Sequence, residues 1–450
     1  MAKALRPVTE LLRTAIETGE WSDVRNRLSP DAVLDTSSEA GRRRIAGAQA
    51  MAAHLGRPGP GAIRDWNSEE WDTGVALSFE WEGESGTDRR RWYLRTDPPG
   101  TITEIWSTAA RPHFADPTET ATPPAALLER LGTSRVEALS HGGNSGATLL
   151  RVRRDDGTAF ILKRVSAGGG DWLARATEDR GRTAQLYEAG AFERMPSVIG
   201  HGIVAVERAA HSAWIAMREV ELLPPDARLS REQSRHILEA AARLHRAFYD
   251  NVPPGAASLS ARIGMSSPAV ADAERAYPDL LPKQFEQGWD AFADLVPGDV
   301  TQPVLDLVRR PQALTEALLH AHRAPTLIHG DLRGDNLGFD GDRLMLIDWD
   351  LATAGTPTAE FAWYLAHSAR RTDATHDEIE ADHRTAQGQH LVEAELELGM
   401  LSGLVQYGWL LAHSARVHPD PAETAWGREE LAWWVPRVRR SLESLGGAPR

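Results

Sequence analysis

The alternation of hydrophobic and polar residues near the start of the chain predicts a sheet preceded by helices. Val75, Leu77, Phe79 and Trp81 alternate with smaller or polar residues, which is the period-two pattern of a half-buried strand. Two helices are expected before this strand and two strands after it, at residues 8–20, 47–55, 89–96 and 101–110. Helices followed by an antiparallel meander indicate a small α+β domain.

A proline-rich segment separates this part from a longer one. Residues 111–125 contain four prolines and little hydrophobic periodicity, which is typical of a linker. We therefore predict a domain at residues 1–112, a linker at 113–125 and a larger domain beyond it.

The larger part opens with alternating helix and strand patterns. A helix is expected at residues 125–131, and Asp156-Gly157 predicts a tight turn between two apolar strands. One continuous helix is expected from about Trp172 to Ala189, and a further strand at residues 213–221. Most of the chain after Asp348 has helical periodicity.

The composition is that of a globular protein and excludes several kinds of site. Of the 450 residues, 42% are hydrophobic and 25% charged, and no apolar run approaches the ~18 residues that a membrane helix needs. The N-terminal segment lacks the apolar core of a signal peptide, so we predict a cytoplasmic protein without a membrane partner. The absence of cysteine excludes disulfides, thiolate metal ligands and a cysteine nucleophile. A net charge of −14 disfavours nucleic acid as a partner.

The segment TLIHGDLRGDNLGFDGDRLMLID, residues 326–348, predicts a short strand, a polar loop and a tight hairpin. The hairpin is expected to hold the loop with Asp331 and Asn336 beside the strand end with Asp348. Phosphoryl transfer needs a carboxylate that orients the attacking hydroxyl and accepts its proton, and oxygen ligands that hold Mg²⁺ on the nucleotide phosphates. We therefore predict Asp331 as the catalytic base, and Asn336 and Asp348 as the magnesium ligands.

Other polar residues of this segment are assigned supporting or surface roles. His329 is expected to orient the loop through hydrogen bonds to the backbone, and direct chemistry remains open for it. Asp335 and Asp350 are expected to be turn or surface residues. Arg333 is expected to be a solvated loop residue, although contact with phosphate or substrate remains open.

These residues resemble the signature of the aminoglycoside phosphotransferase family, which is His-Gly-Asp, four residues, Asn, and Ile-Asp-Trp or Ile-Asp-Phe after a hairpin. The resemblance implies a two-lobed protein-kinase-like α+β fold, with lobes at residues 126–222 and 223–450. It also implies ATP and Mg²⁺ as cofactors, and a hydroxyl of a small molecule (aminoglycoside-like, amino alcohol or sugar) as the acceptor. The alternative is a pseudokinase that binds nucleotide and uses its N-terminal domain to recognise a ligand or partner. The chain lacks the Asp-Phe-Gly and Ala-Pro-Glu segments of protein kinases.

The same resemblance implies a nucleotide site upstream of this segment. Gly142, Gly143 and Ser145 match the glycine-rich loop, whose backbone N–H groups approach phosphates closely. Lys163, on the following strand, is expected to contact the α- and β-phosphates. The kinase-like fold also places a helix glutamate beside this lysine. Thr183 occupies the position where it is expected, which leaves Glu188 and, by preference, Glu178 as candidates.

Two further interpretations concern the hinge and the first domain. The backbone around Glu219 and Val220 is expected to meet the adenine edge. The first domain resembles the cone-shaped nuclear-transport-factor and polyketide-cyclase-like superfamily, whose members enclose a ligand or form dimers through the sheet. A homodimer through this domain is therefore a possible partner arrangement. Candidates for a pocket lining are Asp35, His54, Trp66 and Arg95, and each of them also fits a surface or core position.

Overall fold

The computed structural model describes most of residues 7–446 and divides into two compact units. It leaves out residues 1–6, 39–40, 57–59, 72–73, 84–85, 98–99, 110–121, 134, 140–147, 167–171, 180, 210–211, 225–226, 275–279, 419 and 447–450. One unit comprises Met1–His113, Ala271–Phe292 and Trp409–Glu430, and the other comprises Phe114–Val270, Ala293–Gly408 and Leu431–Arg450. The domain boundaries that the sequence suggests stay a prediction.

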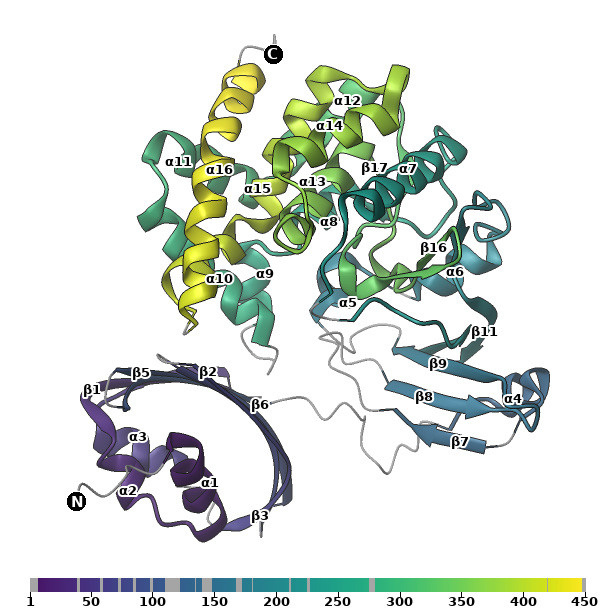
Figure 1. The fold of residues 1–450 in the computed structure, drawn as a ribbon. Coiled ribbons are helices and arrows are strands. Elements are labelled where there is room, and N and C mark those ends of the chain that lie inside the picture. Colours follow the sequence, from purple (N-terminus) through teal and green to yellow (C-terminus); the bar gives the residue numbers. More distant parts are fainter. Residues whose placement is uncertain are drawn as a thin grey trace. The chain divides into compact units, whose positions relative to one another are not determined.

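The N-terminal segment forms a six-stranded sheet that curves around three helices (Figure 1). In the strand order β2-β1-β6-β5-β4-β3, β1 and β6 are parallel and the other neighbours are antiparallel. The predicted strand is confirmed, because Val75, Leu77, Phe79 and Trp81 are all buried in the core. The elements are α1 Val8–Thr18, α2 Ser22–Arg25, β1 Leu28–Ser38, β2 Gly41–Ala46, α3 Ala48–Leu55, β3 Gly61–Trp71, β4 Gly74–Gly83, β5 Gly86–Asp97 and β6 Thr101–Ala109.

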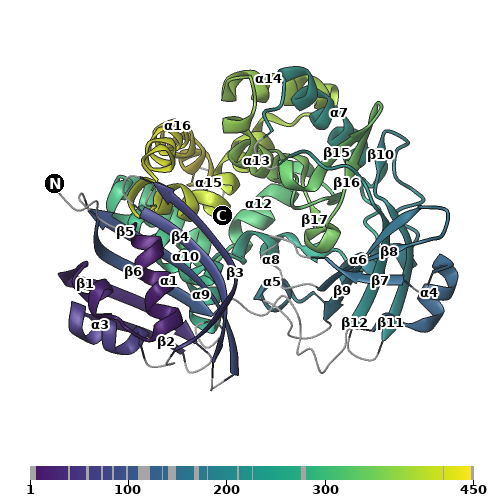
Figure 2. The same ribbon diagram turned by 60° about the horizontal axis from the view of Figure 1, so that its bottom comes forward.

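The first lobe of the second unit is built on a five-stranded antiparallel sheet in the order β11-β12-β9-β8-β7. One face packs against α4 in a core that contains Leu127, Leu162 and Trp214 (Figure 2). Because side chains alternate along a strand, Lys163 of β9 points to the opposite face. The elements are α4 Ala125–Leu131, β7 Arg135–Ala138, β8 Thr148–Arg153, β9 Ala159–Ser166, β11 Ile203–Ala209 and β12 Ser212–Arg218.

The helix predicted over residues 172–189 is broken into α5, Trp172–Thr177, and α6, Arg182–Glu188. Glu178 between them has a φ of 54°, which is far from helical values. The carboxylate of Asp179 then accepts hydrogen bonds from the backbone N–H groups of Gly181 at 2.8 Å and Arg182 at 2.6 Å. Asp179 thereby satisfies N–H groups that the start of α6 leaves without helical partners. The prediction of one continuous helix was wrong.

The second lobe is mainly helical, as predicted for the chain after Asp348, and carries two three-stranded sheets in the orders β10-β16-β15 and β13-β17-β14. None of the helices in the described part of the chain has both the length and the apolar character needed to cross a bilayer. The strands are β10 Ile199–Gly200, β13 Ala257–Ser258, β14 Thr326–Ile328, β15 Leu337–Asp340, β16 Arg343–Leu346 and β17 Thr353–Gly355. The helices that follow the first lobe along the chain are α7 Arg231–Ala247, α8 Leu259–Gly264, α9 Pro268–Ala273, α10 Leu280–Leu295, α11 Gly298–Arg309, α12 Gln312–His322, α13 Pro357–Ser368, α14 His376–Gln387, α15 Glu393–Arg416 and α16 Pro421–Gly446. Most of α10 and parts of α9, α15 and α16 belong to the first compact unit.

Candidate active site

The loop between β14 and β15 is held in a tight turn by backbone contacts. Gly330 has a φ of 80°, and a Cβ atom there would lie 1.9 Å from the backbone oxygen of Leu351, so no larger residue fits. The His329 ring accepts a hydrogen bond from the Asp331 N–H at Nδ1 (3.3 Å) and therefore donates from Nε2 to the Ile347 oxygen (2.9 Å). His329 thus orients the loop through the backbone, as predicted.

The Asp331 carboxylate receives three hydrogen bonds, which fix its position. Trp363 Nε1 donates to Oδ1 at 3.1 Å, while Asn336 Nδ2 at 2.8 Å and Arg333 Nε at 3.1 Å donate to Oδ2. Burial by itself would raise the pKa of Asp331, but the charge of Arg333, with smaller effects of His367 and Arg262, lowers that pKa to about 2. The carboxylate is therefore ionised at neutral pH.

Asn336 lies beside the residue that precedes Asp348, where the loop and the hairpin join. The Ile347 N–H donates to the Asn336 backbone oxygen at 3.1 Å, which holds the loop beside the end of β16. Asn336 uses Nδ2 to bind Asp331, so its amide oxygen is the atom left for a ligand. Asp348 has a φ of 64°, and its side chain is 34% exposed.

These two residues fit a magnesium ion by their chemistry. Mg²⁺ prefers hard oxygen ligands and is commonly held by one or two protein groups together with phosphates and water. Asn336 offers an amide oxygen and Asp348 a carboxylate oxygen, from backbone segments that Ile347 joins by a hydrogen bond. The described residues hold no cluster of three His, Cys, Asp or Glu side chains that would bind a metal by themselves. Asn336 and Asp348 stay the predicted magnesium ligands.

Lys163 reaches the hairpin from the first lobe. Its Nζ lies 2.7 Å from Asp348 Oδ1 and 2.6 Å from Asp350 Oδ2, and only 7% of the residue is exposed. Burial would lower the pKa of Lys163, but the two carboxylates outweigh burial and raise it above its usual value. Lys163 therefore points inward from β9, and its contact with phosphates stays a prediction.

Two predictions about its surroundings were wrong. Glu178 does not pair with Lys163, because it is exposed and lies in the break between α5 and α6. Asp350 is not a surface residue. It is buried, contacts Lys163 and accepts a hydrogen bond from Thr183 Oγ1 at 2.6 Å. The signal for this pairing was present in the sequence as a threonine where a glutamate is expected and an extra carboxylate two residues after Asp348.

The structure describes only some of the other residues that are predicted to bind the nucleotide. Gly142, Gly143 and Ser145 lie outside the described residues. The Glu219 N–H donates to the Ala159 oxygen at 3.1 Å, and the Glu219 carboxylate binds Arg151. This N–H is therefore already bound to another backbone group, and the remaining backbone groups around Glu219 and Val220 stay the predicted contacts of the adenine edge.

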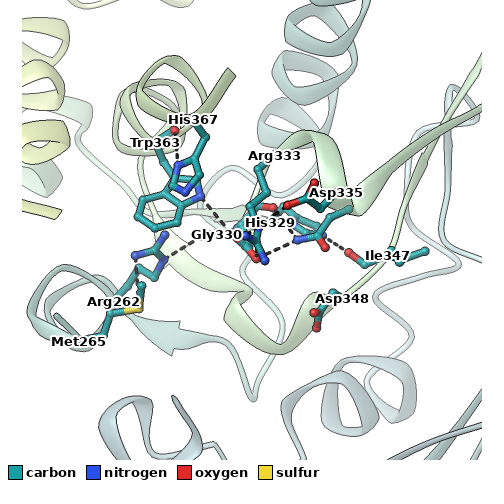
Figure 3. A network of polar contacts seen from close by, with 12 residues as sticks. Arg262, Met265, His329, Gly330, Arg333, Asp335, Ile347, Asp348, Trp363 and His367 are labelled. Carbon is teal, nitrogen blue, oxygen red and sulfur yellow. Dashed lines mark hydrogen bonds and ion pairs between the residues drawn. The ribbon is translucent and has the colours of Figure 1, made fainter. Parts of the chain in front are cut away.

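Charged side chains also support the loop between β14 and β15, through contacts that were not predicted from the sequence. The buried Arg262 donates from Nε to the Gly330 oxygen at 2.8 Å, and its guanidinium lies 3.9 Å from the Trp363 ring centre (Figure 3). Glu360 of α13 is also buried. It accepts a hydrogen bond from the Gly330 N–H at 2.8 Å and contacts His245 Nε2 at 2.7 Å. Arg333 binds Asp331 and is therefore more than a solvated loop residue.

Comparison with solved structures gives weak likenesses to small-molecule kinases. Aminoglycoside phosphotransferase APH(3'')-Id from Streptomyces rimosus is 20% identical, with a TM-score of 0.40, over 65% of this chain and 99% of that one. Choline kinase LicA from Streptococcus pneumoniae is 14% identical, with a TM-score of 0.38, over 71% and 96%. A putative fructosamine-3-kinase from Thermobifida fusca is 21% identical, with a TM-score of 0.36, over 71% and 98%. At these TM-scores the family assignment rests on the sequence instead.

No curated protein matches the chain. A family model described as the phosphotransferase enzyme family matches residues 137–395, which is more than half of the chain. The match contains the His-Gly-Asp and Ile-Asp-Trp segments and agrees with the two-lobed α+β fold. The chain therefore belongs to the phosphotransferase enzyme family, as its segment from His329 to Trp349 predicts.

Proposed function

We propose that this protein transfers the γ-phosphate of ATP, in the presence of Mg²⁺, to a hydroxyl group of a small molecule in the cytoplasm. The observation that carries the proposal is one connected set of groups that phosphoryl transfer requires. Asn336 donates to the carboxylate of Asp331, its backbone is bound to the residue before Asp348, and Asp348 pairs with Lys163.

Asp331 would orient the acceptor hydroxyl rather than remove its proton at the start. With a pKa of about 2, the Asp331 carboxylate is a weak base, but it is a fixed hydrogen-bond acceptor. The hydroxyl proton becomes acidic as its oxygen bonds to phosphorus, and it then passes to Asp331. Trp363 and Arg333 hold the carboxylate in place during this step.

The phosphates would be bound from the other side of the site. Lys163 would contact the α- and β-phosphates, and Val220 the adenine edge. Asn336 and Asp348 would hold Mg²⁺, which when bound neutralises charge on the transferred phosphoryl group. The N-terminal domain would bind a ligand or a second copy of the chain, a role that stays a prediction.

The charges near Asp331 guide the choice of acceptors to test. Arg262 and Arg333 both act on Asp331, and Glu360, the acidic residue beneath the loop, is already bound to Gly330 and His245. A polycationic acceptor gains less from such surroundings than a neutral or anionic one. The panel therefore includes sugars and hydroxy acids as well as aminoglycosides and amino alcohols.

The experiment follows phosphorus NMR signals of ATP, Mg²⁺ and each acceptor with the full chain. We expect a phosphate monoester with at least one acceptor. The variant Asp331→Asn should form no product but should still bind ATP. The control variant Asp340→Asn, in the exposed hairpin turn, should still form product. ATP binding without product from any acceptor would support the pseudokinase alternative.

A further inference from the structure

Among the described residues, Lys163 pairs with no carboxylate of α5 or α6. Protein kinases pair this lysine with a helix glutamate. In the described part of residues 172–188, Glu178 is exposed, Asp179 caps α6, and Glu188 pairs with Arg208 at 2.6 Å. Each acidic residue there has another environment, and the expected position holds Thr183.

Asp350 occupies the place that such a glutamate would fill. Its Oδ2 lies 2.6 Å from Lys163 Nζ, and its Oδ1 accepts a hydrogen bond from Thr183 Oγ1 at 2.6 Å. One carboxylate thus joins β9 to α6. Arg182, the neighbour of Thr183, also donates to the Asp350 backbone oxygen and, at 2.8 Å, to the Thr177 oxygen.

The buried position of these groups makes the pairing obligatory. Exposed fractions are 7% for Lys163, 8% for Asp350, 4% for Thr183 and 2% for Arg182. A buried ammonium group without a partner is strongly unfavourable, because water no longer solvates its charge. Asp348, by contrast, keeps a side chain that is 34% exposed, whereas that of Asp350 is 11% exposed.

The two aspartates therefore have separable tasks. If Asp348 turns toward a metal ion, Lys163 remains neutralised by Asp350. Without Asp350, Lys163 would have only Asp348 as a partner and would compete with Mg²⁺ for its carboxylate. We propose that Asp350 is a positioning residue that replaces the helix glutamate as the partner of Lys163, an inference that rests on the proposed function. Thr183 holds Asp350 in place, and Asp348 is thereby left available to magnesium.

The test measures the affinity of the full chain for ATP by calorimetry, with Mg²⁺ and with EDTA. The quantity compared is the gain in affinity that Mg²⁺ produces. Asp350→Asn should reduce this gain about tenfold, which corresponds to about 1.4 kcal/mol, because Lys163 then competes with Mg²⁺ for the Asp348 carboxylate. Glu188→Gln, on the same helix as Thr183, breaks only an exposed ion pair with Arg208 of β11 and should leave the gain unchanged.

A double variant that moves the carboxylate to α6 tests whether Asp350 acts as the partner of Lys163 or as a ligand of the metal. In Asp350→Asn, the second change Thr183→Glu should restore most of the magnesium-dependent gain, since a glutamate on α6 reaches Lys163 from the position that kinases use. A double variant no better than Asp350→Asn, or a single variant within twofold of wild type, would overturn the inference.

A second pair of variants decides the matter should Asp350→Asn fail to fold. Thr183→Val keeps the shape of the side chain but removes its hydroxyl, and Thr183→Ser keeps the hydroxyl. Thr183→Ser should retain clearly more of the magnesium-dependent gain than Thr183→Val, and equal values would contradict the role of Asp350. A wild-type chain that binds MgATP but phosphorylates no acceptor would overturn the proposed function alone, whereas one that does not bind ATP would overturn both.

Discussion

Replacing Gly330 by alanine should destabilise the protein far more than a glycine substitution in an ordinary turn. At a φ of 80°, an alanine pays roughly 1–2 kcal/mol for the left-handed conformation. Its Cβ would also lie 1.9 Å from the Leu351 oxygen, so the loop has to move by more than an ångström. That movement breaks the buried hydrogen bonds of Gly330 with Glu360 and Arg262, each worth about 1–3 kcal/mol when a partner is left unsatisfied.

The free energy of unfolding should therefore fall by about 3–8 kcal/mol in Gly330→Ala. Gly341→Ala is a matched control, because Gly341 has a φ of 59° and a Cβ there meets nothing within 4 Å. We expect it to cost only about 1–2 kcal/mol, the conformational part alone. Urea unfolding followed by circular dichroism measures both values. Equal losses in the two variants would refute the argument that the contact with Leu351 fixes the loop.

Two further predictions concern buried charges of the loop. The folded protein lowers the pKa of Asp331 from 3.8 to about 2. The ionised carboxylate therefore adds about 2 kcal/mol to the free energy of unfolding above about pH 4, and this contribution is lost as the pH falls to about 2. The stability difference between wild type and Asp331→Asn, followed by thermal unfolding, should shrink over that interval, and a constant difference would count against the assignment. Glu360→Ala removes the partner of Gly330 and His245 and should cost about 3–5 kcal/mol in urea unfolding, whereas a loss below 1 kcal/mol would show that neither contact matters.

The residues predicted from the sequence are those that local geometry brings together. Asp331, Asn336 and Asp348 lie within one strand, loop and hairpin, so spacing alone places them near each other. The first domain was predicted less completely, because β3 contains many polar residues and lacks the clear alternation of β4. The break between α5 and α6 was missed because a helical hydrophobic pattern continues across it while the cap at Asp179 is a local polar signal.

Long-range partners of buried charges had no comparable signal. Arg262 lies in a short amphipathic segment where an arginine is usually exposed, and only the fold brings it against the Gly330 oxygen. The pairing of Lys163 with Asp350 joins residues far apart in the chain. In the sequence this pairing appears only as two separate differences from the kinase pattern, the absence of the helix glutamate and the presence of an additional aspartate. Neither difference indicates the pairing without the other.

Different sets of contacts hold the loop with Gly330 and Asp331 and the side chain of Lys163, so substitutions in the two sets should have different effects. Glu360 of α13 and Arg262 of α8 fix the Gly330 peptide from both ends, and Trp363 of α13 binds Asp331 directly. Lys163 is instead fixed by Asp348 and Asp350. The two sets share no direct partner, and Asn336 connects them through Asp331 and the backbone before Asp348. Substitutions in α8 or α13 should therefore act on the orientation of the acceptor hydroxyl, while those around Lys163 should act on nucleotide and metal.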